Sequence, residues 1–180
     1  EYSIVGHSGD TSQVTFVEFP SLQEQGMEGI GDATNPHSSF LNVGKYACPM
    51  GPLNEKDMLQ ILERMVAHSQ YCFSGDNTLP ATEKAIQRIA QIEAADENVE
   101  RLVIVVSDAN FDRYGIEAWE VSEAMRTSDR VQTHMVMIGG LGDEAQDVVA
   151  ELPVGKGHTC MDSADLPSIL RQILTASLGV

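Results

Sequence analysis

The chain has 180 residues, of which 42% are hydrophobic, and its 11 basic and 27 acidic side chains give a formal net charge of −16. This length and apolar content fit one globular domain with an adequate core. The negative charge repels phosphate backbones and anionic lipid headgroups, so we do not expect a nucleic-acid partner. No apolar run approaches the roughly 18 residues of a membrane span, so we do not expect membrane insertion. Three widely spaced cysteines, without a Cys-x-x-Cys pair, predict a reducing intracellular compartment.

Two β-rich runs open the chain, Tyr2–Gly6 and Gln13–Phe19, and Gly9 and Asp10 between them favour a turn. We predict a hairpin whose second strand lies at a sheet edge. Residues 20–54 are rich in Gly, Pro, Ser and Asn and show no sustained period, which predicts an insertion or mobile loop. Its central part, residues 25–51, is expected to be the most mobile region.

Helical spacing of Met58, Leu62, Met65 and Val66 predicts a helix from Glu55 to about Ser69. The methionines are interpreted as core filler. A polar loop with Gly75 then leads into a second helix, in which Ala85, Ile86 and Ile89 share a face. Asp76, Asn77 or Thr78 is suited to cap this helix, because short polar side chains accept hydrogen bonds from its first free N–H groups.

The stretch from Leu102 to Val106 is an unalternated apolar run that stops at Ser107 and Asp108. Such a run is typical of a strand covered by helices on both faces. Ligands of open α/β sheets bind beyond the carboxyl ends of their strands, which makes Asp108 a candidate ligand-binding residue. The alternative is that Asp108 only supports the following turn.

The remaining pattern continues the alternation of strand and helix. It predicts a helix near residues 118–125, a strand over 131–138, a helix over 145–152, a short strand over 157–161 and a closing helix over 166–174. This alternation favours parallel strands joined by helical crossovers. The expected fold is therefore α/β, a three-layer, doubly wound, mostly parallel and Rossmann-like sheet with one antiparallel edge strand.

The order of these features resembles the von Willebrand factor A domain family over nearly the whole chain. The resemblance rests on the hairpin, on the Ser74-Gly-Asp-Asn-Thr78 loop opening a helix, and on the Val-Val-Ser-Asp108 strand end. More narrowly, Ile4-Val-Gly-His-Ser-Gly-Asp10, Ala67-His-Ser-Gln70, Ser107-Asp-Ala-Asn110 and Arg113-Tyr-Gly-Ile116 look like members in which the domain accompanies AAA-type ATPase modules. Those members are associated with mitochondria, so the resemblance implies an ATPase elsewhere in the same polypeptide and a mitochondrial location.

The resemblance also implies a metal-ion-dependent adhesion site. In this family a D-x-S-x-S loop after the first strand, a Thr in a second loop and an Asp ending a middle strand hold the ion. Thr78 and Asp108 match the last two. Oxygen ligands of this kind suit Mg²⁺ or Mn²⁺, and an acidic side chain of a protein partner would complete the octahedron. The implied function is binding without turnover, so we do not expect this chain to be an enzyme.

One departure from the family pattern affects this site. No D-x-S-x-S occurs in the chain, which opens where the family's second strand should begin. We therefore expect a single domain over residues 1–180 that is incomplete at its N-terminus and carries only part of the ligand set. Ala109 also stands where the family commonly has Gly, although no ligand oxygen is lost. A metal-free structural domain is the alternative.

Enzyme motifs fit less well. Gly6-His-Ser-Gly9 resembles a nucleophile elbow, and Ser8, Asp108 and His134 or His158 follow the hydrolase order. However, Asp10 occupies the fifth motif position and a β-run follows Ser8, where a helix is required.

Nucleotide and zinc motifs are also missing. Gly155-Lys-Gly-His158 lacks the spacing and the hydroxyl residue of a phosphate-binding loop. The histidines show no zinc-binding spacing and are interpreted as surface or satisfied core residues. They are His7, His37, His68, His134 and His158.

Overall fold

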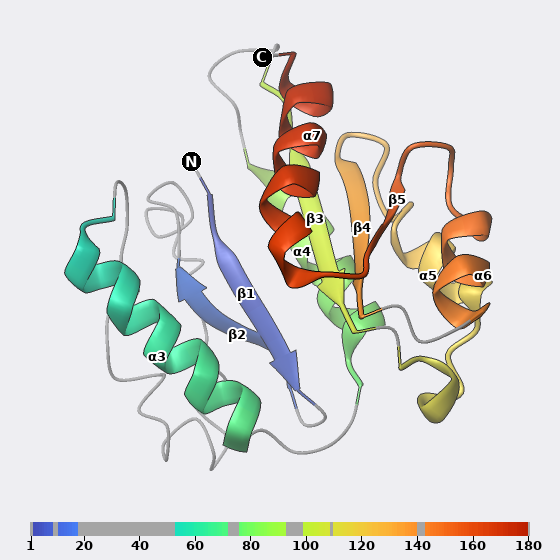
Figure 1. The fold of residues 1–180 in the computed structure, drawn as a ribbon. Coiled ribbons are helices and arrows are strands. Elements are labelled where there is room, and N and C mark those ends of the chain that lie inside the picture. The colour runs from blue at the N-terminus through green and yellow to red at the C-terminus, as the bar shows by residue number, and fades with distance from the viewer. Residues whose placement is uncertain are drawn as a thin grey trace. The chain divides into compact units, whose positions relative to one another are not determined.

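The structure is a computed structural model, and it describes residues 2–8, 11–17, 53–71, 76–92, 99–108, 110–139 and 143–179. The chain divides into two compact units, residues 1–81 and 82–180. Helices and strands alternate along it (Figure 1). No described helix is long and apolar enough to cross a membrane.

The first unit contains an antiparallel hairpin and one long helix. Strands β1 (Ile4–Ser8) and β2 (Thr11–Val17) pair with each other, and helix α3 (Glu55–Tyr71) packs against β2. Phe16 and Val17 of β2 form a small core with Ile61 of α3. Gly6 is required in β1, because a Cβ atom there would lie 2.7 Å from Cε2 of Phe16.

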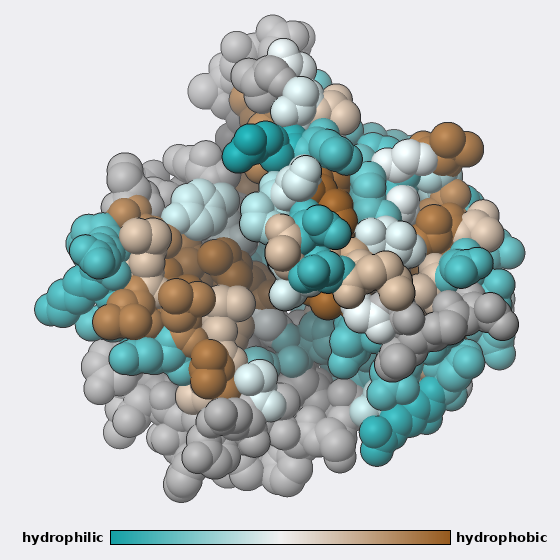
Figure 2. All heavy atoms as spheres, in the orientation of Figure 1, coloured by the Kyte–Doolittle hydropathy of each residue, from teal (hydrophilic) through white to brown (hydrophobic). Residues whose placement is uncertain are grey.

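The apolar face of α3 is not where the sequence suggests. Met58 and Met65 were expected to fill the core, but they are 47% and 38% exposed, so this prediction is wrong. The helix instead buries Ile61 and His68, which share a side of the helix about 100° away from Leu62. Brown spheres over α3 mark apolar side chains left at the surface (Figure 2).

Asn54 starts helix α3. Its Oδ1 accepts a hydrogen bond from the Asp57 N–H at 3.0 Å, and its Nδ2 donates to Asp57 Oδ2 at 2.7 Å. Asn54 is therefore the N-cap residue, and the Asp57 carboxylate holds its side-chain amide in place. Asp57 and Glu55 also place negative charge at the positive end of the helix dipole.

Three parallel strands form the sheet of the second unit, in the order β3 (Leu102–Ser107), β4 (Gln132–Ile138) and β5 (Gly157–Cys160). Strand β3 pairs with β4 from Leu102 opposite Gln132 to Ser107 opposite Met137. The carboxyl ends of these strands therefore reach the same edge of the sheet.

Helices cover both faces of this sheet. On one face, Ile86 of helix α4 (Thr78–Gln91) packs with Val103 and Val131. On the other, Ile173 of helix α7 (Leu166–Leu178) packs with Val136 and Cys160. Alternate β3 residues serve the two clusters, which confirms the expectation of a strand covered on both faces.

Helices α5 (Ala118–Ala124) and α6 (Asp143–Glu151) contact each other beside β5, where the Ser122 hydroxyl donates to the Glu151 carbonyl at 3.0 Å. Gly157 lets β5 approach α6, because a Cβ there would lie 3.1 Å from side chains of Val149 and Leu152. Two 3₁₀ turns complete the second unit, η1 (Asp112–Tyr114) and η2 (Ser163–Asp165).

The predicted α/β class is confirmed, and the parallel sheet between helices is consistent with a Rossmann-like fold. Among the described strands, none pairs with both the hairpin and the parallel sheet, so the continuous sheet with an antiparallel edge stays a prediction. The same holds for the single-domain boundary. The insertion expected at residues 20–54, including its mobile part at 25–51, lies almost wholly outside the described residues.

Candidate functional site

Thr78, one of the two predicted metal ligands, is the first residue of α4 and is 1% exposed. The Asp76 carboxylate holds it at two points. Asp76 Oδ1 accepts from the Thr78 N–H at 2.7 Å, and Asp76 Oδ2 accepts from the Thr78 hydroxyl at 3.2 Å. Asp76 therefore caps the helix and fixes the direction of the Thr78 hydroxyl proton, leaving the lone pairs of Oγ1 to face elsewhere.

His7 of β1 contacts the same hydroxyl. Its Nε2 lies 3.3 Å from Thr78 Oγ1, so the tautomer protonated at Nε2 donates to a lone pair of the threonine. His68 of α3 supports this arrangement, because its Nε2 donates to the His7 carbonyl at 3.0 Å. The first unit thus joins β1, α3 and the start of α4 through polar contacts around one hydroxyl.

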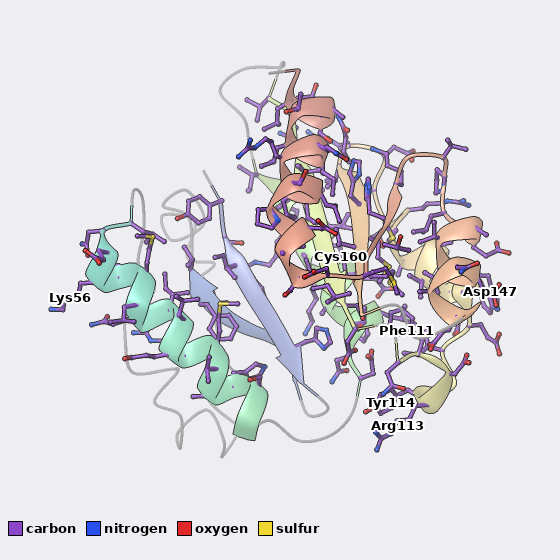
Figure 3. The ribbon with its side chains drawn as sticks, in the orientation of Figure 1. Lys56, Phe111, Arg113, Tyr114, Asp147 and Cys160 are labelled. Atoms are coloured by element: carbon purple, nitrogen blue, oxygen red, sulfur yellow. The ribbon has the colours of Figure 1, made fainter. Side chains whose placement is uncertain are left out.

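Asp108, the second predicted ligand, directly follows β3 and its side chain is exposed. The chain beyond it is held at several points. Phe111 is buried (Figure 3). The Asp112 N–H donates to Glu144 Oε1 at 2.8 Å, and Gly115 ends the η1 turn with a φ of 67°. Asp108 therefore presents a carboxylate from the carboxyl edge of the sheet, next to an anchored turn.

Thr78 lies in the first unit and Asp108 in the second. Because parallel strands bring their carboxyl ends to one edge, the sequence predicts that both residues lie on one rim with the turn of residues 7–10, and this stays a prediction. A hydroxyl and a carboxylate are hard oxygen donors of the kind that Mg²⁺ binds, so their chemistry fits the implied ion. Among the described residues, no group of three or more His, Cys, Asp or Glu side chains is placed to hold a metal.

A buried polar cluster crosses one face of the second unit, from β4 to α7. His134 is 4% exposed, and its Nδ1 lies 3.1 Å from Nε2 of His158. Its Nε2 lies 3.1 Å from Lys156 Nζ and 3.2 Å from Ser177 Oγ of α7. Since an ammonium only donates, His134 Nε2 accepts from Lys156, and the neutral ring then carries its proton on Nδ1 and donates to His158.

Burial is the main cause that lowers the pKa of His134 from 6.5 to about 4, and the charges of Lys156 and then His158 add to it. Burial, and then Lys156, also lower the pKa of His158. Both rings are stacked with centroids 5.4 Å apart. This cluster fits a structural role that ties α7 to the sheet through neutral histidines.

The structure does not bring Asp108 and His134, one Asp–His pair of the alternative hydrolase triad, together. His134 lies opposite Ile104 in the β3–β4 ladder, four residues before Asp108, or about 13 Å along an extended strand. Lys156 likewise turns its ammonium to His134 and, at 3.3 Å, to Gln132 Oε1. The Gly155–His158 segment therefore contributes Lys156 and His158 to the buried cluster.

Sequence reasoning missed two sets of contacts, the bond of His7 to Thr78 and the cluster around His134. A signal for the second was present, because His134 and His158 each stand within a predicted strand and these two strands are consecutive along the chain. The pairing of these two strands was needed to bring the rings together. No comparable signal pointed from His7 to Thr78.

Comparison with known proteins agrees with the fold. The sequence is 34% identical over 178 residues to von Willebrand factor A domain-containing protein 8 of Mus musculus, and the match covers 99% of this chain. The chain spans only about 8% of that relative's length. No protein-family model and no solved structure matches the chain. Its alternating strands and helices, together with this similarity over nearly its full length, support a von Willebrand factor A-like domain that resembles the matching part of that relative.

Proposed function

We propose that this domain is a protein-interaction module whose binding site contains a Mg²⁺ or Mn²⁺ ion held in part by Thr78 and Asp108. The observation that carries this proposal is the state of the Thr78 hydroxyl. The hydroxyl donates its proton in a hydrogen bond to the Asp76 carboxylate. The lone pairs of the oxygen are therefore already oriented to accept before any ligand arrives. The similarity to a von Willebrand factor A domain-containing relative supports the same assignment, because such domains commonly mediate protein interactions.

Two ligands are too few to hold the ion alone. Mg²⁺ prefers six oxygens in near-octahedral geometry and releases water reluctantly. A D-x-S-x-S loop from a segment outside this sequence would supply further oxygens, and an acidic side chain of the partner would take the last position. Ion binding at Thr78 would also compete with the His7 contact at 3.3 Å, which adds to the cost of filling the site.

We also propose that the domain works within a longer polypeptide that carries AAA-type ATPase modules and resides in mitochondria. This rests on the resemblance of its motifs to such members of the family. Hydrolysis of ATP would then belong to the other modules, and this domain would recruit a protein to them. Imaging of the full-length polypeptide in cells tests the location, and exclusion from mitochondria would contradict it.

Titration with Mn²⁺ tests the metal site, because Mn²⁺ binds most oxygen sites at least as well as Mg²⁺ and is easily detected by its magnetic resonance. We expect the present chain to bind it no better than about millimolar. A longer polypeptide containing an upstream D-x-S-x-S loop should bind more tightly by several kcal/mol, roughly a hundredfold or more in Kd.

Substitution identifies the ligands. In the longer polypeptide, Asp108→Ala should abolish the gain, and Thr78→Val should weaken it more than Thr78→Ser. Asp147→Ala is the matched control, because Asp147 is an exposed carboxylate on α6 (Figure 3). Tight binding by the present chain that survives Asp108→Ala would overturn the assignment.

A metal-free structural domain is the second candidate. It is favoured by the observation that the described residues contain no group of three potential His, Cys, Asp or Glu ligands. The same titration separates the two candidates. If the longer polypeptide binds Mn²⁺ no better than the present chain, the structural role is the correct one.

A further inference from the structure

Helix α3 carries a second apolar face that the first unit does not use. Five large apolar side chains line it, with exposed fractions between 38% and 57%. They are Met58, Leu59, Leu62, Met65 and Val66. The spacing places them within an arc of about 120° around the helix, whose centre is about 110° from Ile61 and His68, the residues that contact the hairpin.

This arrangement differs from the scattered exposure of single apolar residues, which is normal at protein surfaces. The five residues follow one another along two turns of the same helix, about 12 Å in length. The brown spheres over α3 show the exposed side of this continuous stripe (Figure 2). Methionine side chains near both ends of the stripe can adjust to the shape of an occupant.

The charges decide which occupant fits. Glu63 flanks the stripe and Glu55 lies at its N-terminal end, with Lys56 also exposed nearby and pointing outward (Figure 3). The chain as a whole carries −16, so a second copy would bring an equal negative charge against this face. The same charge opposes an anionic membrane. An occupant with basic residues beside its apolar face is electrostatically favoured.

We propose that the exposed α3 face is a docking surface for a basic amphipathic helix of a partner protein. A straight apolar stripe one helix face wide accepts such a segment as a second helix laid alongside it, with anchors at i, i+3, i+4 and i+7. The surface deepens the proposed interaction function by naming a partner class, yet it uses neither Thr78 nor Asp108. Its test is therefore independent of metal.

The experiment uses the full chain in EDTA and two fluorescent model helices of equal length. Both peptides carry the same leucine face, and the remaining positions are lysine in one and glutamate in the other. Fluorescence anisotropy should show binding of the lysine peptide and none of the glutamate peptide. Leu62→Gln should lower the affinity for the lysine peptide by about tenfold or more. Leu174→Gln on α7, which also replaces a partly exposed leucine, should leave this affinity unchanged.

Leu62→Gln leaves the net charge unchanged, so it separates docking from general attraction to an acidic protein. Equal affinity of the wild-type chain and Leu62→Gln would overturn the proposal. Sedimentation supplies the second measurement: a dimer that dissociates on Leu62→Gln would show that a second copy occupies the face and would also overturn it. Circular dichroism checks that both variants keep their helices, and failure of Mn²⁺ binding would not affect any of these results.

Discussion

Helices α3 and α7 have similarly spaced apolar residues, but these residues pack on a sheet in α7 and are largely exposed in α3. Helix α7 turns Ile169 and Ile173 onto the parallel sheet, and Ser177 near its end bonds His134. Helix α3 contacts its hairpin mainly through Ile61 and His68 and leaves its richest apolar stripe in solvent. A periodic pattern therefore indicates that a helix has an apolar face, while the neighbouring strands determine whether that face is covered.

The largest test of this difference compares equivalent truncations in the two helices. Ile173→Ala removes a side chain that is 1% exposed, and we expect it to lower the free energy of unfolding of the second unit by about 2–5 kcal/mol. Leu62→Ala should change the stability of the first unit by less than about 0.5 kcal/mol, because the leucine is already largely hydrated. Urea denaturation measures both, and equal losses would contradict the comparison.

Acid should loosen the attachment of α7 next. The pKa of His134 is about 4 in the folded chain, against 6.5 for a histidine in water, so its contribution to stability is complete above about pH 6.5 and disappears as the pH falls towards 4. Between about pH 7 and pH 5 this amounts to about 2 kcal/mol. Lys156 and His158 face the ring directly, and protonation would place like charges together.

Denaturation at several pH values, with and without His134→Gln, measures this contribution. The stability of the variant should fall less steeply between pH 7 and pH 5 than that of the wild-type chain, whatever its starting value. The protection of α7 amides against exchange, corrected for the pH dependence of intrinsic exchange, should fall over the same range. Parallel pH dependences of the two proteins would show that His134 is not the responsible group.

The smallest effect concerns the start of α3. Asn54→Ala removes the acceptor for the Asp57 N–H and should destabilise the first unit by about 1 kcal/mol. Asn54→Ser keeps an acceptor and should recover most of the loss. Amide exchange of the first turn of α3 is the measurement, and unchanged exchange after Asn54→Ala would show that the cap contributes nothing.

Much of the fold was accessible from the sequence because its strands are marked by composition. The run from Leu102 to Val106 predicted a strand between two helical layers, and its end located Asp108 at the carboxyl edge. Thr78 was likewise found at a helix start, although Asp76 rather than Thr78 supplies the capping carboxylate. These features depend on short stretches of chain, which sequence patterns describe well.

Features that depend on how strands pair were not accessible. The exposure of Met58 and Met65 follows from the position of Phe16 and Val17 beside the helix, and helical spacing carries no information about that position. The bond between His134 and His158 depends on the β4–β5 register, in which Val136 lies opposite His158. A shift of one residue would turn His158 to the other face.

Strands β3, β4 and β5 follow one another across the parallel sheet in the same order as along the chain. Each strand therefore adds to an edge that its predecessor has already formed, with Leu102 meeting Gln132 and then Met135 meeting Gly157. The intervals between these partners are moderate, and the entropy lost on closing a loop rises only slowly with its length. A ribosome releases the strands in this same order, so the sheet of the second unit can grow during synthesis without breaking any pairing made earlier.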